Sequence, residues 1–118
     1  MEDARPIFVQ IAEHLQSAII EGTLPEEAQA PSTNELAAFH RINPATAAKG
    51  VSQLVADGVL YKRRGIGMFV CTGARARILD RRRQHFAEQY VRPLLAEAAR
   101  LGLDTEDLKK TIESEAGS

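Results

Sequence analysis

The sequence predicts a mainly α-helical protein with a small β-hairpin: a winged helix-turn-helix domain over residues 1–72, followed by a two-helix C-terminal tail over residues 73–118. Two short helical segments separated by a turn of a few residues are typical of a helix-turn-helix. Two strand-forming segments joined by a glycine turn follow directly and form the wing. The tail is predicted from a long helix-forming stretch that carries a single apolar stripe.

The first predicted helix runs from Pro6 to Gly22. Pro6 suits a first helical position, and Gly22 suits the left-handed residue that ends many helices. Apolar residues recur at helical spacing between them, at Ile7, Ile11, Leu15 and Ala18/Ile19. The following segment, "TLPEEAQAP", is predicted to be a loop because a proline lies near each end.

Local signals mark the next two helices. In "STNE", Ser32 precedes Glu35 by three residues, which is a capping box at a helix start. This helix should end near Arg41, because the residue before a proline avoids helical geometry. Asn43 can then cap a third helix whose first residue is Pro44. "DG" at 57–58 ends that helix.

The third helix has two different faces. Ala47, Ala48, Val51, Leu54 and Val55 gather on one side, and Ala45, Thr46, Lys49, Gln53 and Ala56 gather on the other. Short side chains with hydrogen-bonding tips suit a helix that lies in a DNA major groove. Gly50 costs about 1 kcal/mol relative to alanine in a helix interior. We therefore expect another backbone, such as that of the first helix, to pass close to it.

The predicted strands cover residues 59–63 and 67–71, and Lys62, Arg63 and Arg64 project from the tip of this hairpin. These cations can neutralise phosphates or enter a minor groove. Gly65 and Gly67 allow a tight turn with positive φ and bring the backbone near a duplex. The alternative is an ordinary solvated hairpin with basic side chains.

These segments resemble the GntR family of bacterial transcription regulators. The resemblance covers about residues 6–71 and rests on "PIFVQIAEHLQSAIIEGTL", "PSTNELAAF" and "NPATAAKGVSQLVADGVLYKRRGIGMFV". Asn-Pro-x-Thr and the short tail resemble the YtrA subgroup, whose members pair through C-terminal helices. The resemblance implies a sequence-specific DNA-binding regulator, a repressor, with DNA contacts at Ser32, Thr33, Asn34, Asn43, Ala45, Thr46, Lys49, Arg63, Arg64, Gly65 and Gly67.

This chain departs from the family pattern at several positions. Asn34 stands where many members have arginine, which implies one weaker DNA contact. Arg41 stands where a glycine is common, so a left-handed turn there would carry a strain of about 1 kcal/mol. His40 replaces a usual leucine and is interpreted as a partly buried core residue. Met68 replaces a frequent threonine on the wing.

The tail is expected to form a homodimer that reads an inverted repeat, because a lone helix cannot bury its own apolar stripe. The expected interface residues are Phe86, Tyr90, Leu94, Leu101, Leu108 and Ile112. Five arginines at 75–83 have two interpretations. They can flank DNA and contact phosphates, or form a solvated helix face with Asp80 and Glu88.

Composition narrows the function classes. The net charge of −1 gives no global basic field, so a winged-helix adaptor that binds protein instead of DNA stays an alternative. Cys71 is the single cysteine, and the histidines are scattered, so we expect no enzyme, metal or cofactor. No secretory signal or bilayer-length apolar run appears, which predicts a cytoplasmic protein. The expected partners are double-stranded DNA, a second copy and an unidentified small-molecule effector.

Overall fold

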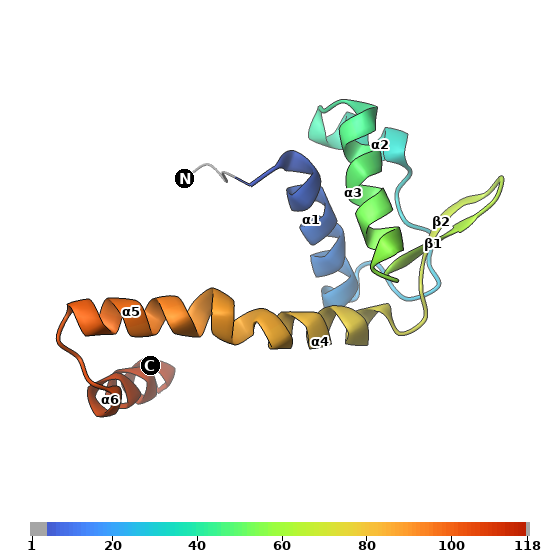
Figure 1. Cartoon of the computed structure of the whole chain (residues 1–118). Coiled ribbons are helices and arrows are strands. Elements are labelled where there is room, and N and C mark those ends of the chain that lie inside the picture. Colours follow the sequence, from blue (N-terminus) through green and yellow to red (C-terminus); the bar gives the residue numbers. More distant parts are fainter. Residues whose placement is uncertain (1–4, 118) are drawn as a thin grey trace. The chain divides into compact units, whose positions relative to one another are not determined.

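The computed structural model describes residues 5–117, which are mostly helical with one antiparallel hairpin, as predicted (Figure 1). The described residues divide into two compact units between Asp80 and Arg81. The elements in chain order are α1 (Ile7–Glu21), α2 (Thr33–His40), α3 (Pro44–Ala56), β1 (Leu60–Arg63), β2 (Gly67–Val70), α4 (Ala74–Phe86), the π-helical turn η1 (Ala87–Val91), α5 (Arg92–Arg100) and α6 (Thr105–Ala116). A functional domain boundary after residue 72 stays a prediction.

The predicted helix boundaries in the winged domain are confirmed to within a residue. Pro6 precedes α1 instead of starting it, and Gly22 ends the helix with φ 90°. Both hydrogen bonds of the Ser32 capping box are present. Arg41 ends α2 in the left-handed region with φ 56°. This arginine, which replaces the usual glycine, therefore has the strained backbone conformation that was expected.

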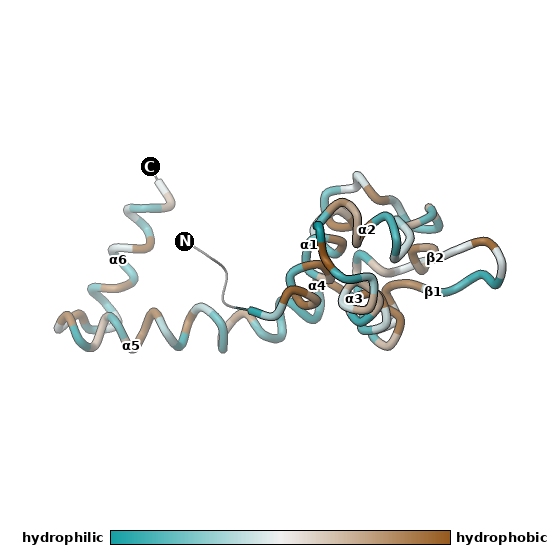
Figure 2. Tube along the Cα trace, turned by 90° about the horizontal axis from the view of Figure 1, so that it is seen from above, coloured by the Kyte–Doolittle hydropathy of each residue, from teal (hydrophilic) through white to brown (hydrophobic). Residues whose placement is uncertain are grey.

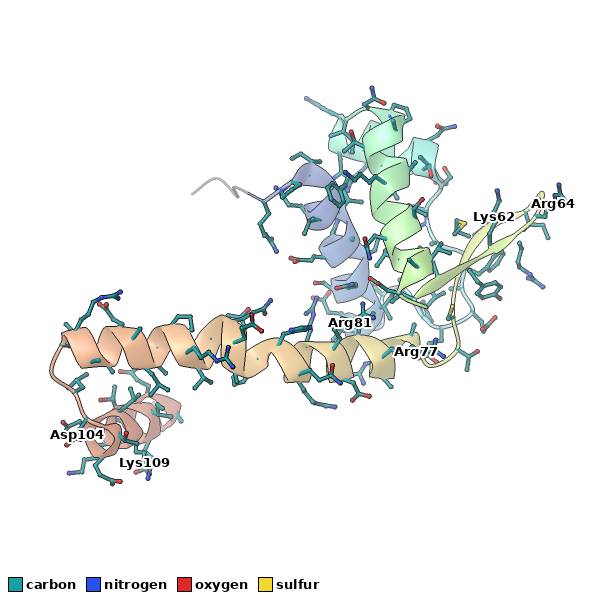
Figure 3. All side chains as sticks on the ribbon, viewed as in Figure 1. Lys62, Arg64, Arg77, Arg81, Asp104 and Lys109 are labelled. Atoms are coloured by element: carbon teal, nitrogen blue, oxygen red, sulfur yellow. The ribbon has the colours of Figure 1, made fainter. Side chains whose placement is uncertain are left out.

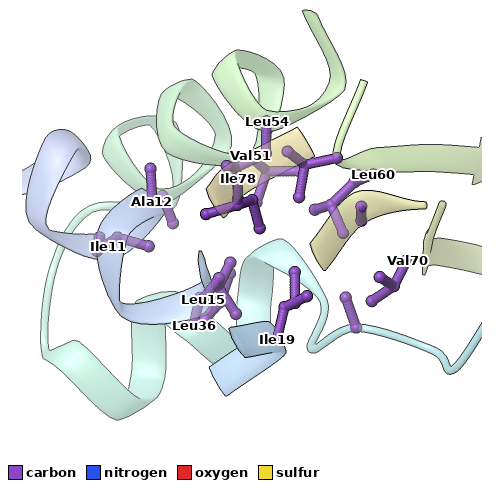
Figure 4. Close-up of a cluster of buried hydrophobic side chains, with 14 of the residues drawn as sticks. Ile11, Ala12, Leu15, Ile19, Leu36, Val51, Leu54, Leu60, Val70 and Ile78 are labelled. Atoms are coloured by element: carbon purple, nitrogen blue, oxygen red, sulfur yellow. The ribbon is translucent and has the colours of Figure 1, made fainter. Parts of the chain in front are cut away.

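One hydrophobic core joins the helices and strands of the first unit (Figure 4). Its most fully buried large side chains come from α1, α3, β1, β2 and the turn before β1, and they are Ile11, Ile19, Leu54, Val59, Leu60 and Val70. Gly50 lies where α1 crosses α3, and a Cβ atom there would stand 2.8 Å from the Phe8 carbonyl oxygen. The expected close backbone approach is therefore present.

The buried face of α3 is narrower than predicted. Ala47, Val51 and Leu54 are buried, but Ala48 is only half-buried and Val55 is 40% exposed. The reason is the α1 crossing at Gly50, which turns the buried side of α3 toward α1 and leaves Val55 at an open edge.

A third, strand-like segment pairs with the two-stranded wing, and the sequence did not indicate it. β1 pairs with β2 in the register Leu60↔Val70 to Arg63↔Gly67. Residues 27–30 add to the outer side of β2: the Ala30 N–H donates to the Met68 carbonyl at 2.8 Å, and the Val70 N–H donates to the Ala28 carbonyl at 3.0 Å. The predicted loop therefore contains a short strand-like segment.

The start of α4 belongs to the winged unit. Ala74 and Ile78 are buried in its core. The Arg75 Nε donates to the Ile20 carbonyl at 3.0 Å, and Arg77 donates to the Gly58 carbonyl at 2.7 Å. These two arginines bind carbonyls at the ends of α1 and α3, a structural use that neither interpretation of the arginine cluster included.

The second unit contains the rest of the tail. η1 interrupts the predicted continuous helix just before Pro93, which has no N–H to donate and whose ring crowds the preceding turn. Gly102 has φ 73°, and Asp104 begins α6 with a capping box. Ala98 and Leu108 are the buried apolar residues of this unit. No helix among residues 5–117 is long and apolar enough to cross a membrane.

Candidate nucleic-acid interface

The N-terminus of α2 presents hydrogen-bonding groups at the surface. The Ser32 hydroxyl accepts from the Glu35 N–H, and the Ser32 N–H donates to the Glu35 carboxylate, each at 3.0 Å. The Ser32 N–H and side chain also lower the pKa of the Glu35 carboxyl, so this cap is ionised at neutral pH. Asn34 is exposed and Thr33 is half-buried. First-turn N–H groups and this positive helix end suit a phosphate.

The N-terminal half of α3 has the small, polar surface that was predicted. Asn43 caps the helix, with its Oδ1 accepting from the Ala45 N–H at 2.8 Å. This bond occupies the Asn43 oxygen and leaves its amide N–H groups available for a partner. Ala45 is exposed and Thr46 is half-buried. Close approach of another molecule to this end of α3 is therefore unhindered by long side chains.

Lys49 is the cation on the exposed face of α3. Its ammonium lies 4.2 Å from the centroid of the Phe8 ring on α1. A cation over an aromatic ring is attracted by the ring face, and this contact restricts the flexible lysine. No local sequence pattern indicates this pair, because Phe8 lies forty-one positions earlier in the chain. Phe8 is therefore a supporting residue that sequence reasoning missed.

The wing tip is a tight turn carrying three cations. The Ile66 N–H donates to the Arg63 carbonyl at 2.9 Å, and Gly65 has φ 77°. Lys62 and Arg64 are exposed and project from the hairpin (Figure 3). Arg63 lies with its guanidinium 4.9 Å from the Phe69 ring centroid, so it is partly held against the wing.

Glu27 anchors the base of the wing. Its carboxylate accepts from the Tyr61 hydroxyl and from the Thr72 hydroxyl, each at 2.6 Å. These hydrogen bonds, that from Thr72 first, lower the pKa of Glu27, and the bond to Glu27 raises the pKa of Tyr61. Beside it, the Glu26 carboxylate accepts from the Gly73 N–H at 2.9 Å, just before α4. The two acids thus connect the wing to the start of the tail.

A single groove of about 480 Å³ brings α2, α3 and the wing together. Its lining includes Ser32 and Thr33 from the start of α2, Ser52 and Val55 from α3, and Lys62, Ile66 and Met68 from the wing. Two predicted contact regions, the α2 start and the wing, therefore share one surface. Ser52, Val55 and Ile66 were not predicted as site residues, since their alignment depends on how the wing folds beside α3.

Fold and surface together define a winged helix-turn-helix protein with a cationic wing. A family model for bacterial regulatory proteins of the gntR family matches residues 8–70, and the chain belongs to this GntR family. It is accordingly a DNA-binding transcription regulator and not an enzyme. The resemblance predicted from the sequence is confirmed.

Two relatives from Bacillus subtilis strain 168 match along most of their length. The chain is 25% identical over 113 residues to the uncharacterized HTH-type transcriptional regulator YhcF, covering 96% of this chain and 92% of that protein. It is 26% identical over 107 residues to the HTH-type transcriptional repressor YtrA, covering 91% and 82%. The short tail is therefore shared with these relatives, as the predicted YtrA-like subgroup requires.

Solved structures agree with the assignment of this chain to the GntR family. A GntR-family protein from Bacteroides thetaiotaomicron superposes with a TM-score of 0.78 at 29% identity, covering 94% of this chain and 96% of that one. The DNA-binding domain of AraR, solved in complex with its operator ORR3, is 31% identical with a TM-score of 0.56, covering 60% of this chain and 86% of that one. The match to AraR covers only part of this chain.

Proposed function

We propose that this chain is a homodimeric repressor that binds an inverted-repeat operator, with α3 in the major groove and the wing beside it. The observation that supports this proposal is the groove between α2, α3 and the wing, whose lining includes three of the predicted contacts: Ser32, Thr33 and Gly67. The proposed DNA contacts remain those expected from the family. Family membership favours DNA over the alternative protein-binding adaptor.

Exposed apolar side chains in the tail support the homodimer. Within residues 81–117, brown apolar positions recur along α5 and α6 (Figure 2). Five of the six expected interface residues are well exposed in the single chain: Phe86 55%, Tyr90 64%, Leu94 42%, Leu101 65% and Ile112 50%. Leu108 is only 7% exposed, so we assign it to packing within the tail that supports the interface from beneath.

Repression and an effector are further parts of the proposal. The relative YtrA is called a repressor, which supports a repressor role for this chain. The protein would act on DNA in the cytoplasm. An effector has a candidate position in a groove of about 440 Å³ between α1 and α2 that includes His14, Phe39 and His40. His40 is half-buried, as expected, and its Nε2 is buried with no hydrogen-bond partner.

Selection of bound duplexes from a random pool tests the proposal. We expect one enriched half-site, repeated with inverted symmetry at a fixed spacing of about one helical turn or more. Lys49→Ala or Arg64→Ala should then weaken binding, and removal of one phosphate-binding cation should reduce the slope of log K against log salt by about 1. Lys109→Ala, an exposed tail lysine, is the control and should change neither quantity. Failure to retain any duplex at low salt would contradict the proposal.

A further inference from the structure

The wing tip presents a large apolar side chain among its cations. Ile66 is 61% exposed, although it lies in the turn that follows Lys62 and Arg63 of β1 and that also contains Arg64. An exposed isoleucine at the end of a basic hairpin adds nothing to solubility and does not belong to the core. Its position suggests that it contacts whatever the surrounding cations attract.

Both backbone polar groups of Ile66 are already used within the domain. Its N–H donates to the Arg63 carbonyl at 2.9 Å, and its carbonyl accepts from the Gln29 Nε2 at 3.1 Å. The Gln29 amide reaches this position because Gly67 lacks a side chain: a Cβ atom there would lie 2.6 Å from the Gln29 Nε2. The Gln29 side chain, from the strand-like segment beside β2, thus holds the wing tip in place. What Ile66 still offers a partner is its aliphatic side chain.

The partner with matching chemistry is the minor groove of DNA. If α3 occupies the major groove, the wing next to it lies at the adjoining minor groove, where its cations meet two lines of phosphates. An A·T pair presents only acceptors there, whereas a G·C pair adds the guanine N2 amino group. An aliphatic side chain cannot accept a hydrogen bond, so covering that amino group leaves a donor unsatisfied.

We propose that Ile66 is a specificity-determining residue that enters the minor groove beside each half-site and disfavours G·C pairs at the contacted step. This inference rests on the proposed function. Other minor-groove proteins also place apolar side chains in this groove, where they insert between base steps. The cations supply affinity without regard to sequence, and Ile66 supplies the preference.

Base substitution at the flanking step tests this role. The selected duplex is prepared with A·T, G·C or inosine·C at each flanking position, since inosine keeps the major-groove pattern of guanine but lacks the N2 amino group. At one of these flanking positions, we expect the unaltered protein to bind the G·C duplex about tenfold more weakly than the A·T duplex. The matching inosine·C duplex should restore most of that affinity.

Two variants assign the effect to Ile66. Ile66→Ala and Ile66→Asn should bring the A·T and G·C affinities together, the second because its amide oxygen can accept from the guanine amino group. Their thermal unfolding midpoints should match that of the unaltered protein, because Ile66 is exposed. Arg64→Ala is the control: it should weaken binding to all three duplexes and keep their ratios.

Three results would overturn the inference. Equal affinity of the unaltered protein for G·C and inosine·C duplexes at every flanking position would show that no guanine amino group is read. Unchanged ratios in Ile66→Ala would show that another residue reads it. Absence of binding to every duplex would instead contradict the proposed function, and this inference with it.

Discussion

At the residue scale, Phe8 contacts α3, the helix proposed to enter the major groove, in two ways. Its carbonyl oxygen occupies the space beside Gly50, and its ring lies beneath the Lys49 ammonium. The glycine allows α1 and α3 to cross closely, and this crossing brings the ring and the lysine together. One residue of α1 therefore contacts α3 both at its closest backbone approach and at its exposed cation.

Gly50→Ala should lower the free energy of unfolding by about 1–3 kcal/mol, because the added Cβ would meet the Phe8 carbonyl oxygen at 2.8 Å. Helix propensity alone predicts the opposite sign, a stabilisation of about 1 kcal/mol. Urea unfolding distinguishes the two. Ser52→Ala, at an exposed position of the same helix, is the matched control and should differ little from the unaltered protein. A stabilised Gly50→Ala variant would refute the close crossing.

Glu27→Gln should remove a pH-dependent part of the stability. The folded-state pKa of Glu27 is lowered from its ordinary value of 4.5, so its charged form stabilises the fold above that pH. This contribution disappears as the pH falls below 4.5 and through the lowered folded-state pKa. Denaturant unfolding from pH 7 to 3 should show the unaltered protein more stable than the variant near neutrality, with the difference shrinking in acid. A difference that stays constant with pH would contradict this account.

At the element scale, the beginning of α4 holds the winged domain together from outside its sequence motif. Arg77 binds the Gly58 carbonyl at the end of α3, and Arg75 binds the Ile20 carbonyl near the end of α1. Each guanidinium thus lies at the negative end of a helix dipole. Glu26 completes the arrangement by accepting from two N–H groups at the start of α4.

Arg77→Ala should therefore destabilise the winged domain by about 1 kcal/mol, as expected for a partly exposed hydrogen bond with a charged donor. Thermal or urea unfolding of the whole chain measures this change in stability. Arg82→Ala, at an exposed position on the same helix, serves as the control and should have a much smaller effect. Equal effects of the two substitutions would mean that the hydrogen bond to Gly58 contributes nothing.

At the scale of the whole molecule, the tail of the single chain exposes several large apolar side chains. Phe86 and Tyr90 are both more than half exposed, and their ring centroids lie 5.6 Å apart. Aromatic pairs of this kind are typical anchors of protein interfaces. A second copy would cover them and also place two recognition helices on one duplex.

The double variant Phe86→Asp/Tyr90→Asp should be monomeric, because the charges cannot be buried in an apolar interface. Sedimentation at micromolar concentration should give half the mass of the unaltered protein. Affinity for a full inverted repeat should fall by about tenfold or more, while affinity for one half-site stays the same. Gln84→Asp, exposed in α4 two residues before Phe86, is the control and should remain dimeric. A monomeric unaltered protein would overturn the proposed assembly.

Much of the fold is predictable because its signals are local. The Ser32 and Asp104 capping boxes join residues only three positions apart, and Gly22 and Gly102 end helices through their own φ angles. The proposed contacts of α2, α3 and the wing were also predicted, since they fall within the family motif. The exposed position of Val55 and the hydrogen bond from Gln29 to the wing tip were not, because both depend on the packing of neighbouring elements.

The sequence by itself determined the helices of the winged domain, the hairpin and the family, because caps, glycines and apolar spacing act within a few residues. The tertiary structure decided three further features. Residues 27–30 pair with the outer side of β2, Arg75 and Arg77 bind backbone carbonyls of the winged domain, and Gln29 holds the Ile66 carbonyl. Their hydrogen bonds join residues far apart in the chain: 37 positions separate Gln29 from Ile66, and 55 separate Ile20 from Arg75. Only folding brings such pairs together, so no local pattern could predict them.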